Sequence, residues 1–436
     1  MSIYNLVSFS GIFVLIFVSW ILSVNKKSVN WKVVVWGMGL QLLIAIFLFL
    51  FPLGTKIFIG INEGVIKILN SATAGGKFVF GRLALAPGEK GPQGETSLGF
   101  ILAFQAFPTI IFFSSLMSIF YYFNILPVII TFLRRLFSSV MRISGAESLA
   151  TASNIFVGIE SAFTIRPYLR EMTISELCTV LTAGMATVAS NVLALYVFTL
   201  REQFPSIAGH LISASLLSAP AAIIISKLLV PETHTPRTLG KDVKLCYEKD
   251  SSLFEAIING ANAGVKVIVG IVALLIAVLG LVSVIDLFLG IIGARVNAIF
   301  NWQFNWTLSN ILGYLFYPLC LVLGMPVSDC SLAGKIIGER LVLTEVVSYR
   351  HLAEAMRQGV FLSPRSPVII AYALCGFAHI ASVAIFVGGI SALVPERTRD
   401  IVRVSWRALL GATLACLLTA CVAGTFLTQK AIILYR

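Results

Sequence analysis

Long apolar runs, separated by short loops that hold most of the charged residues, constrain this chain more than any other feature. A helix that crosses a bilayer needs about 20 mostly apolar residues. Of the 436 residues, 58% are hydrophobic and 12% are charged, whereas soluble domains are roughly 45–50% apolar and about 25% charged. This excludes a soluble enzyme, a disordered chain and a secreted disulfide scaffold, and it predicts an all-α polytopic membrane protein. About eight transmembrane helices are expected, at residues 3–24, 33–53, 100–130, 175–200, 207–230, 255–290, 367–394 and 406–427.

The positive charges indicate how these helices are oriented. The net charge is +12, and short cytoplasmic loops are rich in Lys and Arg. Counting eight spans places all the basic loops on one side of the membrane, at residues 26–32, 134–142, 237–249 and 396–407. The side with the basic loops is therefore expected to be cytoplasmic, with the N-terminus outside and the protein multi-pass in a plasma membrane, the bacterial inner membrane. The charge excess predicts no nucleic-acid partner.

Two further observations refine the ends of the spans. The run at 3–24 is too long for the core of a signal peptide and has no preceding positive charge, so we expect it to remain as a spanning helix. Residues 133–143 form either an amphipathic helix on the cytoplasmic surface or an ordinary basic loop. Both alternatives give the same orientation.

Two segments are too polar to face lipid along their whole length. Residues 146–169 contain Glu160 near their centre, and residues 308–349 combine a half-apolar run with several charged side chains. A charged group at mid-bilayer is expensive, and irregular backbone at that depth must be buried in protein. We therefore expect two re-entrant helical hairpins, the first turning near Gly158 and the second within residues 326–331.

The sequence lacks the usual patterns of catalysis and metal binding. The seven cysteines have no CxxC spacing, and most lie inside apolar runs. They predict small buried side chains and neither a metal site nor a disulfide framework. Because no nucleophile–base pair or metal-ligand spacing stands out, an enzyme is not predicted.

A stretch in the second predicted hairpin resembles a known signature. Gly338-Glu-Arg-Leu-Val-Leu-Thr-Glu-Val-Val-Ser-Tyr349 is similar to the G-x-K-x-x-x-N-E-F-V-A-Y motif of concentrative nucleoside transporters. The resemblance runs from about Phe100 to the C-terminus, and the first two helices resemble the N-terminal pair of bacterial members. Further similar stretches occur in the family's order at residues 217–220, 231–233, 256–266 and 373–378.

The resemblance implies a fold and a mode of action. It implies an inverted-repeat transport domain on a trimeric scaffold, and a homotrimeric symporter that imports nucleosides by alternating access. The implied partners are a nucleoside, the bilayer and the other copies of the chain, with no cofactor. The chain then divides into N-terminal helices with an outer loop over 54–97 (1–97), a scaffold helix with an interfacial helix (98–145), a first repeat (146–230), a cytoplasmic loop with a long scaffold helix (231–305) and a second repeat (306–436).

The resemblance also implies which residues bind the substrate and the coupling ion. Glu345 corresponds to the carboxylate that accepts hydrogen bonds from the ribose hydroxyls, an arrangement that is strong in a dry site. The ion ligands correspond to the side chains of Asn154 and Thr187 and the carbonyls of Val157 and Val188. The implied substrate-binding residues are Gly158, Ile159, Glu160, Ser161, Val192, Thr344, Glu345, Phe377, His379 and Ser382.

Either Na⁺ or H⁺ is compatible with these residues. Hard cations prefer oxygen ligands, so Asn154 and Thr187 suit Na⁺. Glu160, Glu345 and His379 would suit H⁺. The retained asparagine and hydroxyl favour Na⁺ as the coupling ion.

Two of these residues also have an ordinary structural interpretation. Glu345 is alternatively an ion-pair partner of Arg340 or Lys335. A lone histidine on an apolar helix, such as His379, is alternatively a core residue, although an ionisable group inside a membrane is a functional candidate by default. A histidine with a pKa near neutrality could also carry a proton.

Three positions depart from the family's pattern. The first hairpin reads Gly158-Ile-Glu-Ser-Ala-Phe163, one residue shorter than the usual G-Q-T-E-A-P region, and Thr344 and His379 stand where the family has Asn. These departures keep a second interpretation open, a transporter of the same fold for another nucleobase-containing or small polar solute. A membrane receptor without transport activity is the third, and the lack of a soluble signalling domain disfavours it.

Overall fold

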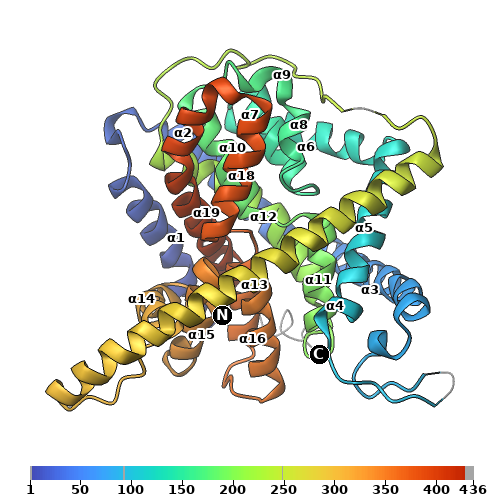
Figure 1. The fold of residues 1–436 in the computed structure, drawn as a ribbon. Coiled ribbons are helices and arrows are strands. Elements are labelled where there is room, and N and C mark those ends of the chain that lie inside the picture. Colours follow the sequence, from blue (N-terminus) through green and yellow to red (C-terminus); the bar gives the residue numbers. More distant parts are fainter. Residues whose placement is uncertain (1, 92–93, 248, 428–436) are drawn as a thin grey trace.

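The computed structural model describes residues 2–91, 94–247 and 249–427. Within these ranges the chain is helical, and only two isolated β-bridges occur. Seven helices are long and apolar enough to cross a membrane. The remaining expected span, 367–394, is present as two shorter helices, α17 (Arg365–Leu374) and α18 (Ile380–Leu393), with an unwound segment between them. The predicted all-α polytopic architecture is confirmed, and the span at 367–394 is broken near its middle (Figure 1).

The N-terminal region differs from the prediction in one element. Helices α1 (Ile3–Ile21) and α2 (Trp31–Leu50) lie where expected. The outer loop predicted over 54–97 is wrong for most of its length, because α3 (Pro52–Phe80) is a helix of 29 residues. Its buried residues recur at helical spacing, as expected for a helix that packs one face on the rest of the molecule. After the short η2 (Gly81–Ala84), the loop ends near residue 101, and its residues 92–93 lie outside the described ranges.

The span expected at 100–130 is divided by two local signals. Pro108 is the second residue of α5 (Phe107–Tyr122), which follows the single turn α4 (Leu102–Gln105). Proline loses no hydrogen bond in a first turn, so Pro108 begins a helix here and does not interrupt one. Asn124 then adopts a left-handed φ of 62° and ends the run. The amphipathic α6 (Ile125–Met141) follows, as the surface-helix interpretation of 133–143 predicts.

The first hairpin forms where it was predicted. It consists of α7 (Gly145–Asn154), α8 (Ser161–Thr164) and α9 (Arg166–Leu169), with non-helical residues around Gly158. The next span is interrupted as well, into α10 (Ile174–Ala186) and α11 (Ser190–Leu200). In contrast, α12 (Ile207–Leu229) continues through Pro220.

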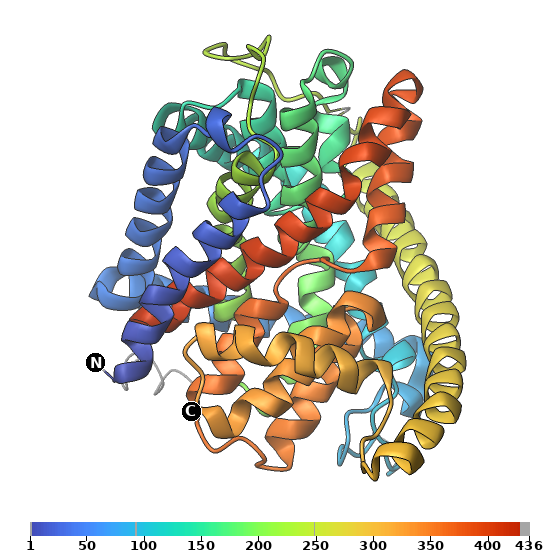
Figure 2. The ribbon, with the colours of Figure 1, turned by 90° about the vertical axis from the view of Figure 1, so that its left-hand side faces the viewer.

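The long helix α13 (Leu253–Phe300) has 48 residues and exceeds the predicted span at 255–290. It crosses one face of the molecule diagonally in Figure 1 and follows one edge in Figure 2. Its most apolar window is only 6% buried within the chain. Two of its glycines explain how it packs on α5: an added Cβ on Gly260 would lie 2.6 Å from the Ser115 Cα, and one on Gly264 would lie 2.7 Å from the Ile111 Cα.

The second hairpin turns at a different place from the prediction. Residues 308–349 form α14 (Leu308–Val322) and α15 (Val327–Leu343), joined by a turn at Gly324 with φ 76°. The turn therefore precedes the predicted 326–331, most of which is the first turn of α15. A second reversal at Thr344 leads into α16 (Glu345–Arg357), and the prediction missed it. The segment is a set of three antiparallel helices, because Glu339 on α15 contacts His351 on α16.

The two hairpins lie at opposite ends of the molecule. Helices α7 to α9 are at the end that also holds the connection between α1 and α2, the 231–252 loop and the turn η3 (Pro395–Arg397) before α19 (Thr398–Phe426). Helices α14 to α16 form a layer at the other end (Figure 2). The basic loops therefore share one end, as the charge pattern predicts.

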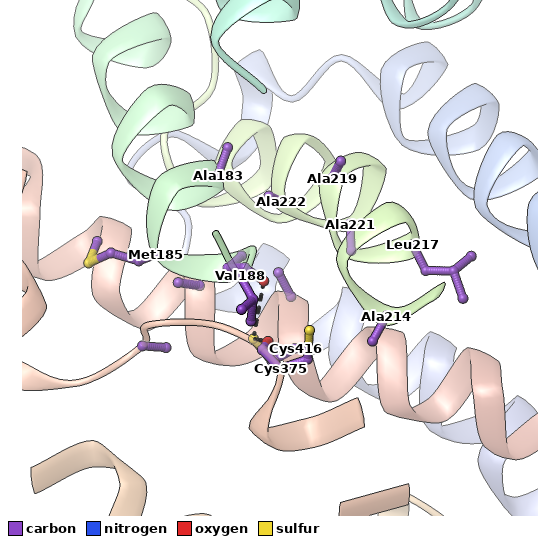
Figure 3. Packing of buried hydrophobic residues seen from close by; sticks show 14 of the residues in the cluster. Ala183, Met185, Val188, Ala214, Leu217, Ala219, Ala221, Ala222, Cys375 and Cys416 are labelled. Carbon is purple, nitrogen blue, oxygen red and sulfur yellow. Dashed lines mark hydrogen bonds between the residues drawn. The ribbon is translucent and has the colours of Figure 1, made fainter. Parts of the chain in front are cut away.

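Small side chains fill the centre between these ends. Figure 3 shows alanines of α10 and α12 beside Cys375 and Cys416, whose Sγ donates to the Cys375 carbonyl at 2.7 Å. Small residues allow helices to approach closely in a membrane. The five cysteines predicted to be buried (Cys178, Cys320, Cys375, Cys416, Cys421) are all buried and unpaired.

Candidate functional site

Four interruptions of helices meet inside the molecule. The Ser190 amide, which follows the break between α10 and α11, donates to the Phe156 carbonyl of the first hairpin at 2.9 Å. Gly376, in the break between α17 and α18, has a φ of 132°, and an added Cβ there would lie 2.8 Å from the Ala186 carbonyl oxygen. Broken helices leave backbone N–H and C=O groups without helical partners. In membrane proteins such backbone is tolerated where it is buried or lines a binding site.

The fourth interruption presents a buried carboxylate. Glu345 is the first residue of α16 and is 2% exposed. Its Oε1 accepts a hydrogen bond from the Tyr196 hydroxyl at 2.6 Å, and its Oε2 lies 3.1 Å from His379 Nε2. Neither cation proposed as its structural partner pairs with it: the Arg340 guanidinium donates to the Ala373 carbonyl, and Lys335 is exposed. The carboxylate therefore accepts from Tyr196 and lies close to His379, and both residues come from other interrupted segments.

The hydrogen bonds around His379 define its tautomer. Nδ1 accepts from the Ser382 amide at 3.1 Å, so His379 caps the N-terminus of α18. A ring nitrogen that accepts carries no proton, so the proton of the neutral imidazole is on Nε2, the atom that lies 3.1 Å from Glu345 Oε2. An asparagine here would offer the same cap through its oxygen and would have two N–H groups. The neutral histidine has only one, on Nε2.

Thr344, which precedes Glu345, has an unfavourable backbone conformation. Its φ is 85° and its ψ is 158°, a region that essentially only glycine adopts. Its side chain is buried, and its hydroxyl has no hydrogen-bond partner among the described residues. The tip of the second hairpin is therefore held in a strained conformation by its surroundings.

Replacing Thr344 with glycine should stabilise the protein. Relief of such a conformation is worth about 1–3 kcal/mol, while glycine costs roughly 0.5–1 kcal/mol through the unfolded chain, so a net gain near 1 kcal/mol is expected. Thermal unfolding of the detergent-solubilised protein measures it. Thr413→Gly, inside α19, is the control and should lower the melting temperature. A Thr344→Gly protein that melts below wild type would contradict the strain.

Two of the implied ion ligands, Asn154 and Thr187, lie together at the ends of α7 and α10. The Thr187 hydroxyl donates to the carbonyls of Asn154 and Ala183, each at 2.9 Å, and the Ser161 hydroxyl donates to Asn154 Oδ1 at 2.8 Å. Asn154 and Thr187 are each 1% exposed. The hydroxyl oxygen of Thr187 and the nearby carbonyls keep lone pairs that these hydrogen bonds do not use. An uncharged oxygen set of this kind fits Na⁺.

Glu160 is separate from the Glu345 cluster. It lines a cavity of about 430 Å³ at the end of the molecule that holds the basic loops, between α5, the first hairpin and the 231–252 loop. Its side chain is exposed, and no side chain among the described residues pairs with its carboxylate. Glu345 does not line this cavity.

The remaining predicted residues differ in exposure. Val192 and Ser382 are buried, and the Ser382 hydroxyl donates to the His379 carbonyl at 2.6 Å. Gly158, Ile159 and Phe377 are half-buried. Tyr196 was not predicted from the sequence. A buried tyrosine usually needs a partner for its hydroxyl, so a tyrosine inside the apolar span at 175–200 was a signal that could have identified it.

Comparison with family models connects this architecture to known proteins. Residues 210–424 match a model described as the Na⁺ dependent nucleoside transporter C-terminus, and residues 10–83 match the corresponding N-terminus. Residues 103–202 match a model described as nucleoside recognition. The matched residues include both hairpins, the break between α10 and α11, and the break between α17 and α18.

Individual relatives cover nearly the whole chain. The nucleoside permease NupC of Helicobacter pylori is 35% identical over 98% of this chain and 99% of its own length. Solute carrier family 28 member 3 of Mus musculus is 35% identical over 96% of this chain, which spans only 58% of that longer protein. The structure of CNTnw in an inward-facing substrate-bound state has a TM-score of 0.85 and 34% identity, and covers 97% of this chain and 98% of its own.

Proposed function

Because this chain belongs to the family of Na⁺-dependent, concentrative nucleoside transporters, we propose that it is a symporter that imports nucleosides by alternating access, driven by a Na⁺ gradient. As a member of this family it is a membrane transporter and not an enzyme. The observation that carries the nucleoside substrate is the buried Glu345 carboxylate among broken helices, whose Oε1 accepts from Tyr196 and whose Oε2 has no hydrogen-bond partner among the described residues.

A carboxylate in this environment suits a ribose. Its two oxygens have about four acceptor positions, and the Tyr196 hydroxyl uses one of them. The vicinal 2′ and 3′ hydroxyls of a ribose can take two others as charge-assisted hydrogen bonds. We assign Thr344, Phe377 and Ser382 to the walls around the sugar.

The base is assigned to the first hairpin and α11. In this proposal Val192 supplies an apolar wall, and Gly158, Ile159, Glu160 and Ser161 border the base. Ser161 is also bonded to Asn154, so movement at the hairpin tip on substrate binding is coupled to the ion ligands.

Na⁺ is favoured over H⁺ by the contacts of His379. Protonation of this side chain requires a hydrogen on Nδ1, and Nδ1 accepts from the Ser382 amide. A proton there would remove the N-cap of α18, worth about 1 kcal/mol, and place two donors against each other. The oxygen ligands Asn154, Val157, Thr187 and Val188 require no such rearrangement to bind Na⁺. Glu160 and Glu345 remain the carboxylates through which an H⁺-coupled mechanism would act.

The oligomer and the membrane orientation are also part of the proposal. An apolar helix of 48 residues that is largely uncovered within one chain is suited to face lipid and other copies, so we assign α13 and α5 to the centre of a homotrimer. With the basic loops at one end, the N-terminus lies outside a bacterial inner membrane. Light scattering of the detergent-solubilised protein measures the oligomer, and a monomer would contradict it.

Uptake into proteoliposomes tests the coupling. An inward Na⁺ gradient should drive accumulation of radiolabelled uridine, adenosine or guanosine, and a pH gradient alone should not. Thr187→Val, which is isosteric but lacks the hydroxyl, should lose at least about tenfold of the Na⁺ stimulation, since a lost ligand of 1.4 kcal/mol or more is a factor of ten.

Thr187→Ser is the matched control, because it retains the hydroxyl and should retain Na⁺ dependence. Gradient-independent behaviour of the wild type toward all nucleosides would overturn the symporter. Uptake driven by a pH gradient in wild type, unchanged in Thr187→Val, would favour H⁺.

A second candidate is a transporter of the same fold for another nucleobase-containing or small polar solute. The observation that favours it is His379, which has a single N–H where the asparagine of the family would offer two, and whose Nε2 lies 3.1 Å from the Glu345 carboxylate. Competition of the uptake assay with free nucleobases separates the two, because a nucleoside site requires the ribose.

A further inference from the structure

Arg340 is a buried cation that has no anionic partner. It lies in the last turn of α15, and the residue is 1% exposed. None of the ion pairs within the described residues includes it, and its Nε has no hydrogen-bond partner there. A buried charge without a counter-charge is strongly destabilising. The charge of Arg340 must therefore be balanced by something other than a carboxylate.

The guanidinium is directed at the carboxyl end of a broken helix. Its Nη1 donates to the carbonyl of Ala373 at 2.6 Å, and Ala373 is the second-last residue of α17. The Ala371 carbonyl, two residues earlier, accepts from the uncharged Tyr349 hydroxyl at 3.0 Å. The carboxyl end of a helix carries roughly half a negative charge and attracts cations. Arg340 is therefore the positive charge that balances the end of α17.

The carboxyl end of α10 lies against that of α17. An added Cβ on Gly376, just past the end of α17, would lie 2.8 Å from the carbonyl oxygens of Met185 and Ala186 in the last turn of α10. The Cys416 Sγ lies 2.7 Å from the Cys375 carbonyl oxygen and 3.7 Å from that of Ala186 (Figure 3). Two helix ends of the same sign repel each other, and the repulsion is strong at the low dielectric of a buried site. This junction therefore favours a positive charge at each helix end.

The two helix ends differ in the groups that face them. At the end of α10, the Thr187 hydroxyl donates to the carbonyl of Asn154, the last residue of α7, and both side chains are uncharged. In the proposed inverted repeats, α7 corresponds to α15 and α10 corresponds to α17. Arg340 thus has a place in the second repeat that is similar to the place of Asn154 in the first. In transporters built from inverted repeats, the carboxyl ends of half-helices coordinate the coupling cation. The first repeat offers oxygen ligands for an ion from solution, and the second repeat supplies its own cation.

We infer that Arg340 is a permanent cation in the position of a second coupling ion, so that each protomer couples one Na⁺, bound at the end of α10, to each nucleoside. The inference rests on the proposed function, because it assumes a Na⁺-driven symporter. Arg340 is not among the residues assigned to the ribose or the base, so it is a positioning residue that holds the break between α17 and α18. Its removal would leave the end of α17 open to a second Na⁺.

The accumulation ratio of the wild-type protein measures the number of coupled ions. Proteoliposomes receive a roughly tenfold inward Na⁺ gradient with the membrane potential clamped at zero, and radiolabelled uridine, adenosine or guanosine is followed to steady state. Each coupled ion contributes the same free energy, so one Na⁺ sustains about a tenfold nucleoside gradient and two sustain about a 100-fold gradient. A ratio near tenfold is expected, and a ratio clearly above it overturns the inference. Absence of uptake for every nucleoside overturns the proposed function instead.

Arg340→Ala tests the role of the charge. In this variant the Hill coefficient of Na⁺ activation should rise from about 1 toward about 2, because a second ion can bind at α17 and the coefficient is limited by the number of sites. Arg340→Lys is the matched control, since it keeps the positive charge and should keep a coefficient of about 1. An active Arg340→Ala protein with an unchanged coefficient would mean that the arginine only caps α17, and it overturns the inference.

Melting curves of the detergent-solubilised protein provide the same test for an Arg340→Ala protein that does not transport. A bound ligand stabilises the folded state in proportion to the logarithm of its concentration, once for each site. The slope of the stabilisation against the logarithm of the Na⁺ concentration, with choline keeping the total salt constant, should be about twofold steeper in Arg340→Ala than in wild type. Arg340→Lys should have the wild-type slope. Equal slopes in all three proteins overturn the inference.

Discussion

Glu345→Gln is expected to lower nucleoside uptake by at least about 100-fold without unfolding the protein. Hydrogen bonds to a charged group are worth about 1.5–3 kcal/mol each, and the ribose is proposed to make two. The loss of 2.8 kcal/mol or more corresponds to a factor of 100. Glutamine keeps the shape of the side chain but replaces one acceptor oxygen by an NH₂ group. That group would oppose either the Tyr196 hydroxyl or the Nε2–H of His379, and both are donors.

The measurement is initial uptake into proteoliposomes under an inward Na⁺ gradient, with the elution profile and the oligomeric mass as checks on folding. Glu354→Gln is the matched control. It lies on the same helix, and its carboxylate pairs with Arg350 at the surface, at 3.1 Å. This variant should transport as wild type, because an exposed pair contributes little, about 0–1 kcal/mol. Wild-type uptake by Glu345→Gln would remove Glu345 from the substrate site.

Tyr196→Phe separates the role of the carboxylate from that of its partner. The phenyl ring keeps the stacking on Tyr349, whose centroid is 4.6 Å away, and leaves one Glu345 oxygen without its donor. A positioning role for Tyr196 then appears as a weaker substrate affinity with the maximal rate retained, whereas Glu345→Gln affects both.

The sequence predicted the architecture better than its local turns. The polar segment around Glu160 identified the first hairpin, because a charged group at mid-membrane leaves few alternatives. The same reasoning located the second hairpin only approximately. Its turn is set by Gly324, while the functional tip is at Thr344, a residue whose conformation no propensity would predict. Strain of this kind depends on the surrounding packing, which a single sequence does not contain.

Contacts between distant helices were the least predictable part of the site. Arg340 is five residues before Glu345, which suggested an ion pair, but the reversal at Thr344 places the two residues on different helices. Its guanidinium donates to the Ala373 carbonyl at 2.6 Å. Glu345 instead contacts Tyr196 and His379, which are 149 and 34 residues away along the chain. Sequence spacing predicts which residues are neighbours on one helix, but it does not predict contacts between residues on different helices. The prediction of an outer loop over 54–97 was wrong for a related reason. The glycines of α3 lower its helix propensity, and the helix is stabilised by packing that the sequence does not show.

The largest effect on stability is expected at Lys227, near the end of α12 that faces the basic loops. Its ammonium group lies 2.8 Å from Glu147 and 3.4 Å from Glu232, and the side chains of Lys227 and Glu147 are 7% and 1% exposed. Ser144, the N-cap of α7, donates its hydroxyl to Glu176 at 2.5 Å, and its amide donates to Glu147. The lysine is thus the cation among carboxylates that cap the first hairpin and α10.

Lys227→Met should destabilise the protein by about 3–5 kcal/mol, because it keeps most of the volume but leaves a buried carboxylate without its counter-charge. Thermal unfolding and the yield of correctly eluting protein measure the loss. Lys241→Met, an exposed lysine of the 231–252 loop, controls for the charge change and should be close to neutral. The double variant Lys227→Met, Glu147→Gln should recover part of the stability, because the amide retains an acceptor for the Ser144 amide and removes the uncompensated charge. A double variant no more stable than Lys227→Met alone would show that volume, and not charge, makes this lysine necessary.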